Sequence, residues 1–225
     1  MILLATDTSG KHGSISLARA SEPDHSARAV EILETVPLEG GTFSAQLIPQ
    51  ISTLLARHHL TRHHIDGFAV ASGPGSFTGL RVGLAAIKAL AEVLGKPIAA
   101  VSLLEALALA SSTRGTIFAA LDAGRGEVYV GEYEVSNSAV MRRESLLSRK
   151  EFLTQAAAPM VTSDQTIADA ARAAGLRWEL VEYPGSAAIA RIGWEKLQTG
   201  NTVSPDALEA NYIRRSDVEI FATPK

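Results

Sequence analysis

A glycine-rich segment, Gly73-Pro74-Gly75-Ser76-Phe77-Thr78-Gly79, lies between a short apolar run and a long helical pattern. At that place a phosphate could lie on the amino terminus of the helix. The dinucleotide fingerprint is excluded because its third glycine would fall at Thr78, and the NTPase phosphate loop because no Gly-Lys-Ser/Thr follows. A nucleophile elbow needs Gly-x-Ser-x-Gly, which is not the pattern around Ser76. The alternative is a strand-to-helix turn whose glycines permit tight packing.

Two aspartates occupy matching points of two similar segments. Asp7 follows the apolar run that opens the chain, and Asp122 follows the run 116–121. Small turn residues and an alternating, strand-like segment come after each, which suggests a duplicated strand–hairpin–helix unit. The pair could orient a magnesium-bound phosphate if both hairpins faced one cleft. An aspartate at a strand end can equally close an Asx turn, and the sequence leaves both interpretations open.

Four histidines follow the first predicted helix. Their arrangement, His58-His59 and His63-His64, fits no standard metal-ligand spacing. At the end of a helix, imidazoles meet the negative end of the helix dipole. We therefore interpret the histidines as a solvated helix end and predict no metal site.

The composition bounds the possible functions. The chain has 225 residues, a formal net charge of −3, 46% hydrophobic residues and no cysteine. It can bury a core, and a disulfide framework, a thiolate zinc site and a cysteine nucleophile are all excluded. The mild acidity argues against a protein that holds nucleic acid through its overall charge, although a local basic patch is compatible with a near-neutral total. A basic leader and an apolar stretch of about 18 residues are both missing, so we expect a cytoplasmic protein without membrane association.

Short strand-like runs alternate with longer runs of helical spacing, which predicts an α/β protein of two similar lobes. Strands are predicted over 1–7, 14–18, 28–36, 68–71, 98–101, 116–121, 127–130 and 178–182. Helices are predicted over 43–57, 76–94, 103–109, 164–174 and 186–198.

The helix predicted over 76–94 is unusually apolar. Ser76 is a good N-cap and Gly95 a good C-terminal stop. Its only charges, Arg81, Lys88 and Glu92, fall within about 40° of one another, so most of its circumference must be covered. The small residues Gly79, Gly83 and Ala86 form a seam that would admit a neighbouring helix. Such a helix is either fully internal or part of a partner surface.

Taken together, Asp7-Thr8-Ser9, the stretch 72–97 and the stretch 122–129 resemble the TsaB (YeaZ) family, bacterial proteins of the tRNA threonylcarbamoyladenosine pathway. The most specific piece is Gly73-Pro74-Gly75-Ser76-Phe77-Thr78-Gly79-Leu80-Arg81-Val82-Gly83-Leu84, continuing through Lys88 and Gly95-Lys96-Pro97. Tyr212-Ile213-Arg214 is similar to the family's closing Tyr-Leu-Arg signature. One departure is Phe43-Ser44, where the family often has His-Ser.

The resemblance implies two actin-like, ribonuclease H-like lobes with mixed sheets flanked by helices. We expect an N-terminal lobe over 1–103 that carries the partner-binding helices. A smaller C-terminal lobe is expected over 104–225, with a tail that can pack back on the first. In that superfamily, paired hairpins containing aspartate hold nucleotide phosphates. A vestigial nucleotide site would therefore comprise Asp7, Thr8, Ser9, Asp122 and Gly124.

The catalytic relative TsaD has the same Gly-Pro-Gly helix. Resemblance to TsaD would require a metal-binding His-x-x-x-His pair after the strand at 98–101. An i, i+4 pair places two imidazoles on one helix face, as chelation needs. This chain has Leu103 and Leu107 at those positions, and leucine ligates nothing. The resemblance therefore implies a pseudoenzyme with no catalytic residues, no metal and no cofactor.

As a TsaB-like protein, the chain is expected to bind and support TsaD in forming threonylcarbamoyladenosine at the adenosine beside the anticodon of tRNAs that read codons beginning with A. TsaE would join through that assembly, tRNA would be reached only through the complex, and the chain alone would form a homodimer. The expected contact residues are Leu47, Ile51, Leu54, Gly79, Leu80, Gly83, Leu84 and Ile87. The alternatives are an ATP–magnesium-dependent actin-like enzyme that uses Asp7 and Asp122 and, least supported because His-Glu-x-x-His is absent, a metalloprotease or chaperone.

Overall fold

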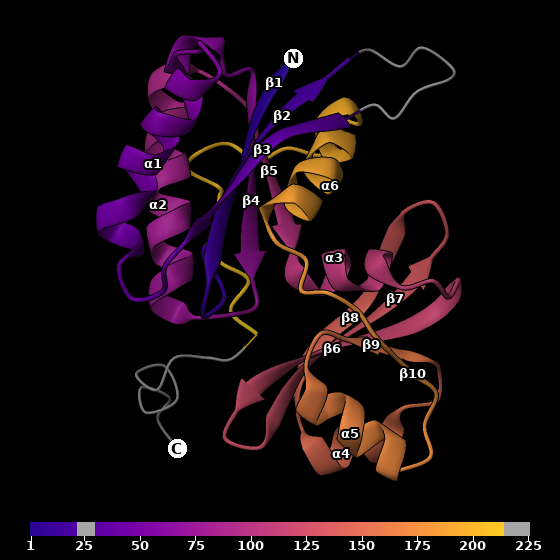
Figure 1. The fold of residues 1–225 in the computed structure, drawn as a ribbon. Helices are drawn as coiled ribbons and strands as arrows, with labels where there is room; N and C mark the ends of the chain where they lie inside the picture. Colours follow the sequence, from indigo (N-terminus) through magenta and orange to yellow (C-terminus); the bar gives the residue numbers. More distant parts are fainter. Residues whose placement is uncertain (22–29, 214–225) are drawn as a thin grey trace, which may run out of the picture. The chain divides into compact units, whose positions relative to one another are not determined.

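The computed structural model describes residues 1–21 and 30–213 of the chain (Figure 1). These residues form two compact units. Unit 1 consists of Met1–Ala106 together with Pro184–Ala210, and unit 2 consists of Leu107–Tyr183 together with the tail from Asn211. Helix α3 (Leu103–Ala110) begins in unit 1 and ends in unit 2.

Unit 1 is built on a five-stranded mixed sheet in the order β3-β2-β1-β4-β5. Its strands are β1 (Ile2–Asp7), β2 (Gly13–Ala20), β3 (Val30–Leu38), β4 (Gly67–Gly73) and β5 (Ile98–Ser102). Strands β1, β2 and β3 are antiparallel, whereas β4 and β5 run parallel to β1. The helices are α1 (Phe43–Arg57), α2 (Phe77–Leu94) and α6 (Ser186–Gln198), and a short 3-10 turn, η1 (Arg62–His64), precedes β4.

The helices of unit 1 cover both faces of this sheet (Figure 1). On one face α1 and α2 pack over alternate strand residues, including Leu4, Ile15 and Phe68. On the other face α6 approaches the backbone closely, because a Cβ at Gly193 would lie 2.3 Å from the Cβ of Ala69. The ends of α2 are as predicted: the Ser76 side chain accepts from Gly79 N, and Gly95 adopts a left-handed φ of 63°.

Unit 2 contains a second five-stranded mixed sheet, in the order β10-β9-β6-β7-β8. Its strands are β6 (Gly115–Gly124), β7 (Glu127–Val135), β8 (Ala139–Ser148), β9 (Met160–Thr162) and β10 (Trp178–Leu180). Helices α4 (Arg149–Gln155) and α5 (Gln165–Ala173) contribute Phe152 and Ile167 to a core with Phe118, Val130 and Met160.

The two sheets share one topology. Three antiparallel strands (β3-β2-β1 and β8-β7-β6) are followed by two strands parallel to the third (β4-β5 and β9-β10). Strands β1 and β6 are therefore equivalent, with Asp7 and Asp122 near their carboxyl ends. This repetition confirms the α/β class and the duplicated unit inferred from the sequence.

Two parts of the chain differ from prediction. Residues 184–210, including α6, belong to unit 1. The expected boundary at 103/104 assigned them to the C-terminal lobe, with a tail that can pack back on the first lobe. The contact between Gly193 and Ala69 joins residues far apart in sequence, which a local pattern does not reveal. Strands β8 and β9 and helix α4 were not predicted. The start of the third predicted strand, residues 28–29, and Arg214 lie outside the described residues.

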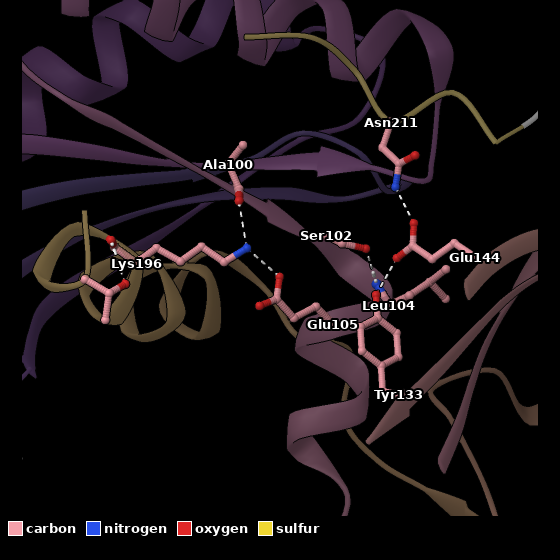
Figure 2. A network of polar contacts seen from close by, with 9 residues as sticks. Ala100, Ser102, Leu104, Glu105, Tyr133, Glu144, Lys196 and Asn211 are labelled. Carbon is pink, nitrogen blue, oxygen red and sulfur yellow. Dashed lines mark hydrogen bonds and ion pairs between the residues drawn. The ribbon is translucent and has the colours of Figure 1, made fainter. Parts of the chain in front are cut away.

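Two polar networks, one in each unit, fix segments distant in sequence (Figure 2). In unit 1, Lys196 Nζ of α6 donates to Ala100 O at 3.0 Å and contacts Glu105 Oε2 at 2.7 Å. In unit 2, Glu144 accepts hydrogen bonds from the Tyr133 hydroxyl and the Asn211 amide, which holds the start of the tail on β7 and β8. Neither network contains a group that the sequence predicted to be functional.

Candidate functional site

The first aspartate hairpin is closed by its own hydrogen bonds. Asp7 Oδ1 accepts from Ser9 N at 2.9 Å and from the Ser9 hydroxyl. Asp7, Thr8 and Ser9 are all buried. This geometry is an Asx turn, one of the two interpretations that the sequence left open for Asp7.

The glycine-rich segment packs tightly on the same hairpin. Ser76 N donates to Ser9 O at 2.7 Å, so one N–H at the start of α2 is occupied by the chain itself. A Cβ at Gly75 would lie 2.4 Å from Ser9 O, and one at Gly79 would lie 2.0 Å from Thr8 O. Such distances are too short for any side chain. The interpretation of these glycines as residues that permit tight packing is therefore confirmed.

The second aspartate hairpin has a different partner. Asp122 Oδ1 lies 3.6 Å from the Arg149 guanidinium, and Arg149 N donates to Gly126 O at 2.9 Å. Both charged side chains are partly exposed. The turn uses left-handed backbone at Gly124, Arg125 and Gly126. An arginine thus supplies the positive charge next to Asp122, where a nucleotide site would need a metal ion or phosphate donors. Whether Asp7, Thr8, Ser9, Asp122 and Gly124 act together on a nucleotide stays a prediction.

Two of the histidines, His58 and His64, have structural roles. His58 Nε2 is 2.9 Å from Glu34 Oε2, and His64 Nδ1 accepts from Thr61 N at 3.0 Å, which caps η1. Within residues 1–21 and 30–213, no group of three or more His, Cys, Asp or Glu side chains is placed to hold a metal ion.

Leu103 and Leu107 lie one turn apart on α3 and are both buried. They therefore contribute to apolar packing at the positions where the resemblance to TsaD would call for metal ligands. The sequence identified these two residues correctly as apolar.

The eight residues expected to contact a partner lie in the core. All are buried, and they pack within unit 1. Gly83 faces the hairpin rather than a second helix, since a Cβ there would be 2.3 Å from Thr8 Oγ1. The helical spacing identified the apolar stripe, and that stripe turns toward the sheet of unit 1.

The outer face of α2 carries exposed apolar side chains beside the exposed charges of Arg81 and Glu92. Val93 is 78% exposed and Phe77 42% exposed, and Ala85 and Ala89 are exposed between them. On α1, Ile48 is 48% exposed. We call these five residues the outer α1–α2 face. Arg81 lies on the same side of α2, with its guanidinium carbon 3.6 Å from the centroid of the Phe77 ring. Exposed apolar side chains that recur along one helix face are typical of a protein-binding surface.

The sequence of this chain is similar to those of known proteins of one family. The model described as "TsaD: tRNA N6-adenosine threonylcarbamoyltransferase" matches residues 40–189, more than half of the chain. The "tRNA threonylcarbamoyladenosine biosynthesis protein TsaB" of Bacillus subtilis is 36% identical over 138 residues, which cover 61% of this chain and 57% of that protein. The chain belongs to the TsaB (YeaZ) family.

Other TsaB proteins extend the match. The Escherichia coli protein of the same name is 27% identical over 76% of this chain and 80% of its own length. The matches to the Bacillus and Haemophilus influenzae proteins span little more than half of those relatives, 57% and 53%. A crystal structure from Pseudomonas aeruginosa, described as similar to peptidase YEAZ, matches 95% of this chain and 99% of its own, with a TM-score of 0.75 and 22% identity. This last match supports the TsaB fold of two actin-like lobes.

In the described part of the chain, none of the helices combines the length and the apolar character that a membrane span requires.

Proposed function

We propose that this chain is a non-catalytic subunit that supports a TsaD-type transferase in forming threonylcarbamoyladenosine at the adenosine beside the anticodon of tRNAs that read codons beginning with A. Two findings support a role in this modification. Its curated relatives are named tRNA threonylcarbamoyladenosine biosynthesis proteins, and the matching family model is described as the transferase.

The absence of catalysis is inferred from α3 and the two hairpins. Leu103 and Leu107 offer hydrocarbon where a metal-dependent relative needs imidazoles. The carboxylate of Asp122 is next to Arg149, and Asp7 accepts hydrogen bonds from Ser9. Each carboxylate thus has a partner from the chain itself at its Oδ1 atom, so we favour a binding role over the enzymatic alternative.

The observation that carries the proposal is the exposed outer α1–α2 face. Val93, Ala89, Ala85 and Phe77 follow one side of α2, and burying such side chains against a partner removes apolar area from water, which favours association. We propose that TsaD binds here and that a second copy of this chain binds the same face when TsaD is absent. TsaE would join through the resulting assembly.

The test combines reconstitution with one surface variant. Omitting this chain from the purified pathway should abolish modified tRNA, and Val93→Glu should abolish copurification with TsaD because it places a charge in an apolar interface. Val140→Glu is the matched control, since Val140 is 62% exposed on β8 of unit 2. Both variants should unfold at the wild-type temperature.

Three results would contradict the proposal. Modified tRNA that still forms without this chain removes the supporting role. Unchanged copurification of Val93→Glu removes the outer α1–α2 face from the interface. Tight binding and turnover of ATP–magnesium by the chain alone, measured by calorimetry, would favour the enzymatic alternative.

A further inference from the structure

The segment between α1 and β4 is rich in cationic and hydrogen-bond-donating side chains. Residues 57–64 read Arg-His-His-Leu-Thr-Arg-His-His, so six of eight are arginine or histidine. The segment comprises the last residue of α1, the connecting turn and η1. All four of Arg62, His59, His63 and His64 are exposed. We call residues 57–64 the Arg/His segment.

The acidic groups with contacts at this end of unit 1 are already paired. Glu34 of β3 lies 2.9 Å from the Arg57 guanidinium and 2.9 Å from His58 Nε2. Asp66 accepts from Ile2 N at 2.8 Å and lies 3.7 Å from Lys96 Nζ. These carboxylates are therefore occupied by cations other than Arg62.

Three side chains of the Arg/His segment have no other role in unit 1. Over residues 1–21 and 30–213, the side chains of His59, Arg62 and His63 make no hydrogen bond or ion pair. Arginine presents five N–H donors and no acceptor, and an imidazole presents at least one N–H in either charge state. His59, Arg62 and His63 also follow the carboxyl end of α1, where the helix dipole favours cations.

This combination fits a phosphate backbone better than a protein surface. Phosphate oxygens are acceptors only, and arginine pairs with them in fork geometry. Guanidinium and imidazole planes also stack on the unpaired bases of RNA loops. The net charge of −3 prevents binding through the overall charge, but phosphate contacts are local.

We propose that the Arg/His segment binds the phosphate backbone of RNA, so that this chain contacts tRNA directly in addition to its protein partner. The inference rests on the proposed function, because that function makes tRNA the nucleic acid within reach. It differs from the expectation that tRNA is reached only through the complex.

The experiment measures binding of fluorescently labelled tRNA to the full chain by anisotropy, at salt concentrations from about 50 to about 200 mM. The variant is Arg62→Ala/His63→Ala, which removes two exposed side chains and leaves the His64 cap of η1 intact. The matched control is His12→Ala/Arg177→Ala, which removes an exposed histidine and an exposed arginine elsewhere. We expect the variant to bind about tenfold more weakly with a salt slope lower by about 1, and the control to bind as wild type.

Each other outcome contradicts the inference. It fails if the wild-type chain does not bind tRNA at the lower salt concentration, or if the variant and the control bind tRNA equally. It also fails if vesicles of phosphatidylglycerol, measured in parallel, are the only probe whose binding the variant loses. Reconstitution separates this failure from failure of the proposed function. Normal dependence of tRNA modification on this chain, with unaltered tRNA binding by the variant, rejects the RNA contact alone.

Discussion

Gly83 of α2 lies directly against Thr8 of the first aspartate hairpin. A Cβ at Gly83 would be 2.3 Å from Thr8 Oγ1, and that same hydroxyl donates to Gly79 O at 2.7 Å. The hairpin and the first two turns of α2 are therefore held together by a side chain that fits only because α2 carries glycine there. The glycine spacing serves the packing of unit 1.

We predict that Gly83→Ala destabilises the chain by about 1–3 kcal/mol, because the added methyl group forces Thr8 out of its place. Thr8→Ala removes the obstructing hydroxyl at the cost of one hydrogen bond, about 1 kcal/mol. The double variant should consequently be more stable than the sum of the single changes predicts. Urea unfolding of the three variants measures this coupling, and additive effects would show that the hairpin shifts freely to accept the methyl group.

The elements were largely predictable from the sequence, whereas their outward faces were not. Apolar spacing and caps located α2 between Ser76 and Gly95, and the similar segments at Asp7 and Asp122 revealed the repeated topology. Strand β8 was missed because an edge strand lacks a regular alternation: neighbouring Val140 and Met141 are both exposed.

The candidate contact residues lie on the two predicted helices, α1 and α2, and their side chains turn toward the sheet of unit 1. An apolar position on a helix contacts either its own sheet or a partner, and spacing alone does not distinguish the two. The assignment of Leu47 and Ile87 depended on the position of the sheet, which is set by strand pairings distant in sequence. The contact between Asp122 and Arg149 could not be predicted from the sequence either, because Arg149 belongs to an element that was not predicted.

Self-association through α2 should depend on two complementary charges. Arg81 and Glu92 are exposed and lie eleven residues apart, so they share one helix face at 100° per residue. In an antiparallel twofold pairing of α2 helices, Arg81 of one copy would face Glu92 of the other. We predict that Arg81→Glu weakens the homodimer several-fold and that Arg81→Glu/Glu92→Arg restores it. Sedimentation equilibrium measures the association, and a double variant as weak as the single one would refute this pairing.

The ion pair between Lys196 and Glu105 should matter much more than surface pairs. Lys196 Nζ lies 2.7 Å from Glu105 Oε2, with side-chain exposures of 18% and 14%. We predict that Lys196→Met costs about 3 kcal/mol, because it leaves a largely buried carboxylate without its cation. Lys196→Met/Glu105→Leu should recover most of this loss, since an apolar pair of similar volume replaces the charges.

The control for this pair is Arg19→Ala. Arg19 and Glu31 form a surface pair at 3.4 Å, and removing it should change the free energy of unfolding by less than about 1 kcal/mol. Urea unfolding at neutral pH measures all three variants. If Lys196→Met and Arg19→Ala were equally mild, the Lys196 pair would contribute no more than an exposed one.

The loop between α3 and β6 should loosen in acid because of Glu179. Partial burial would raise the pKa of this carboxyl, but hydrogen bonds from Ser111 Oγ at 2.7 Å and Ser112 N at 3.0 Å outweigh burial and lower the pKa below its ordinary value of 4.5. A lowered pKa in the folded state contributes stability above the unfolded pKa, and this contribution is lost as the pH falls through the folded pKa. The unfolding free energy should therefore decrease below about pH 4.5.

Glu179→Gln isolates the contribution of this carboxylate. The amide retains an acceptor oxygen but has no charge to titrate, so the variant should be less stable than wild type at neutral pH and should approach it in acid. Ser111→Ala should act in the same direction by removing the 2.7 Å hydrogen bond. Denaturant unfolding at several pH values, together with hydrogen exchange of the Ser112 and Thr113 amides, measures both effects. A difference between Glu179→Gln and wild type that stays constant with pH would show that Glu179 acts through its shape and not through its charge.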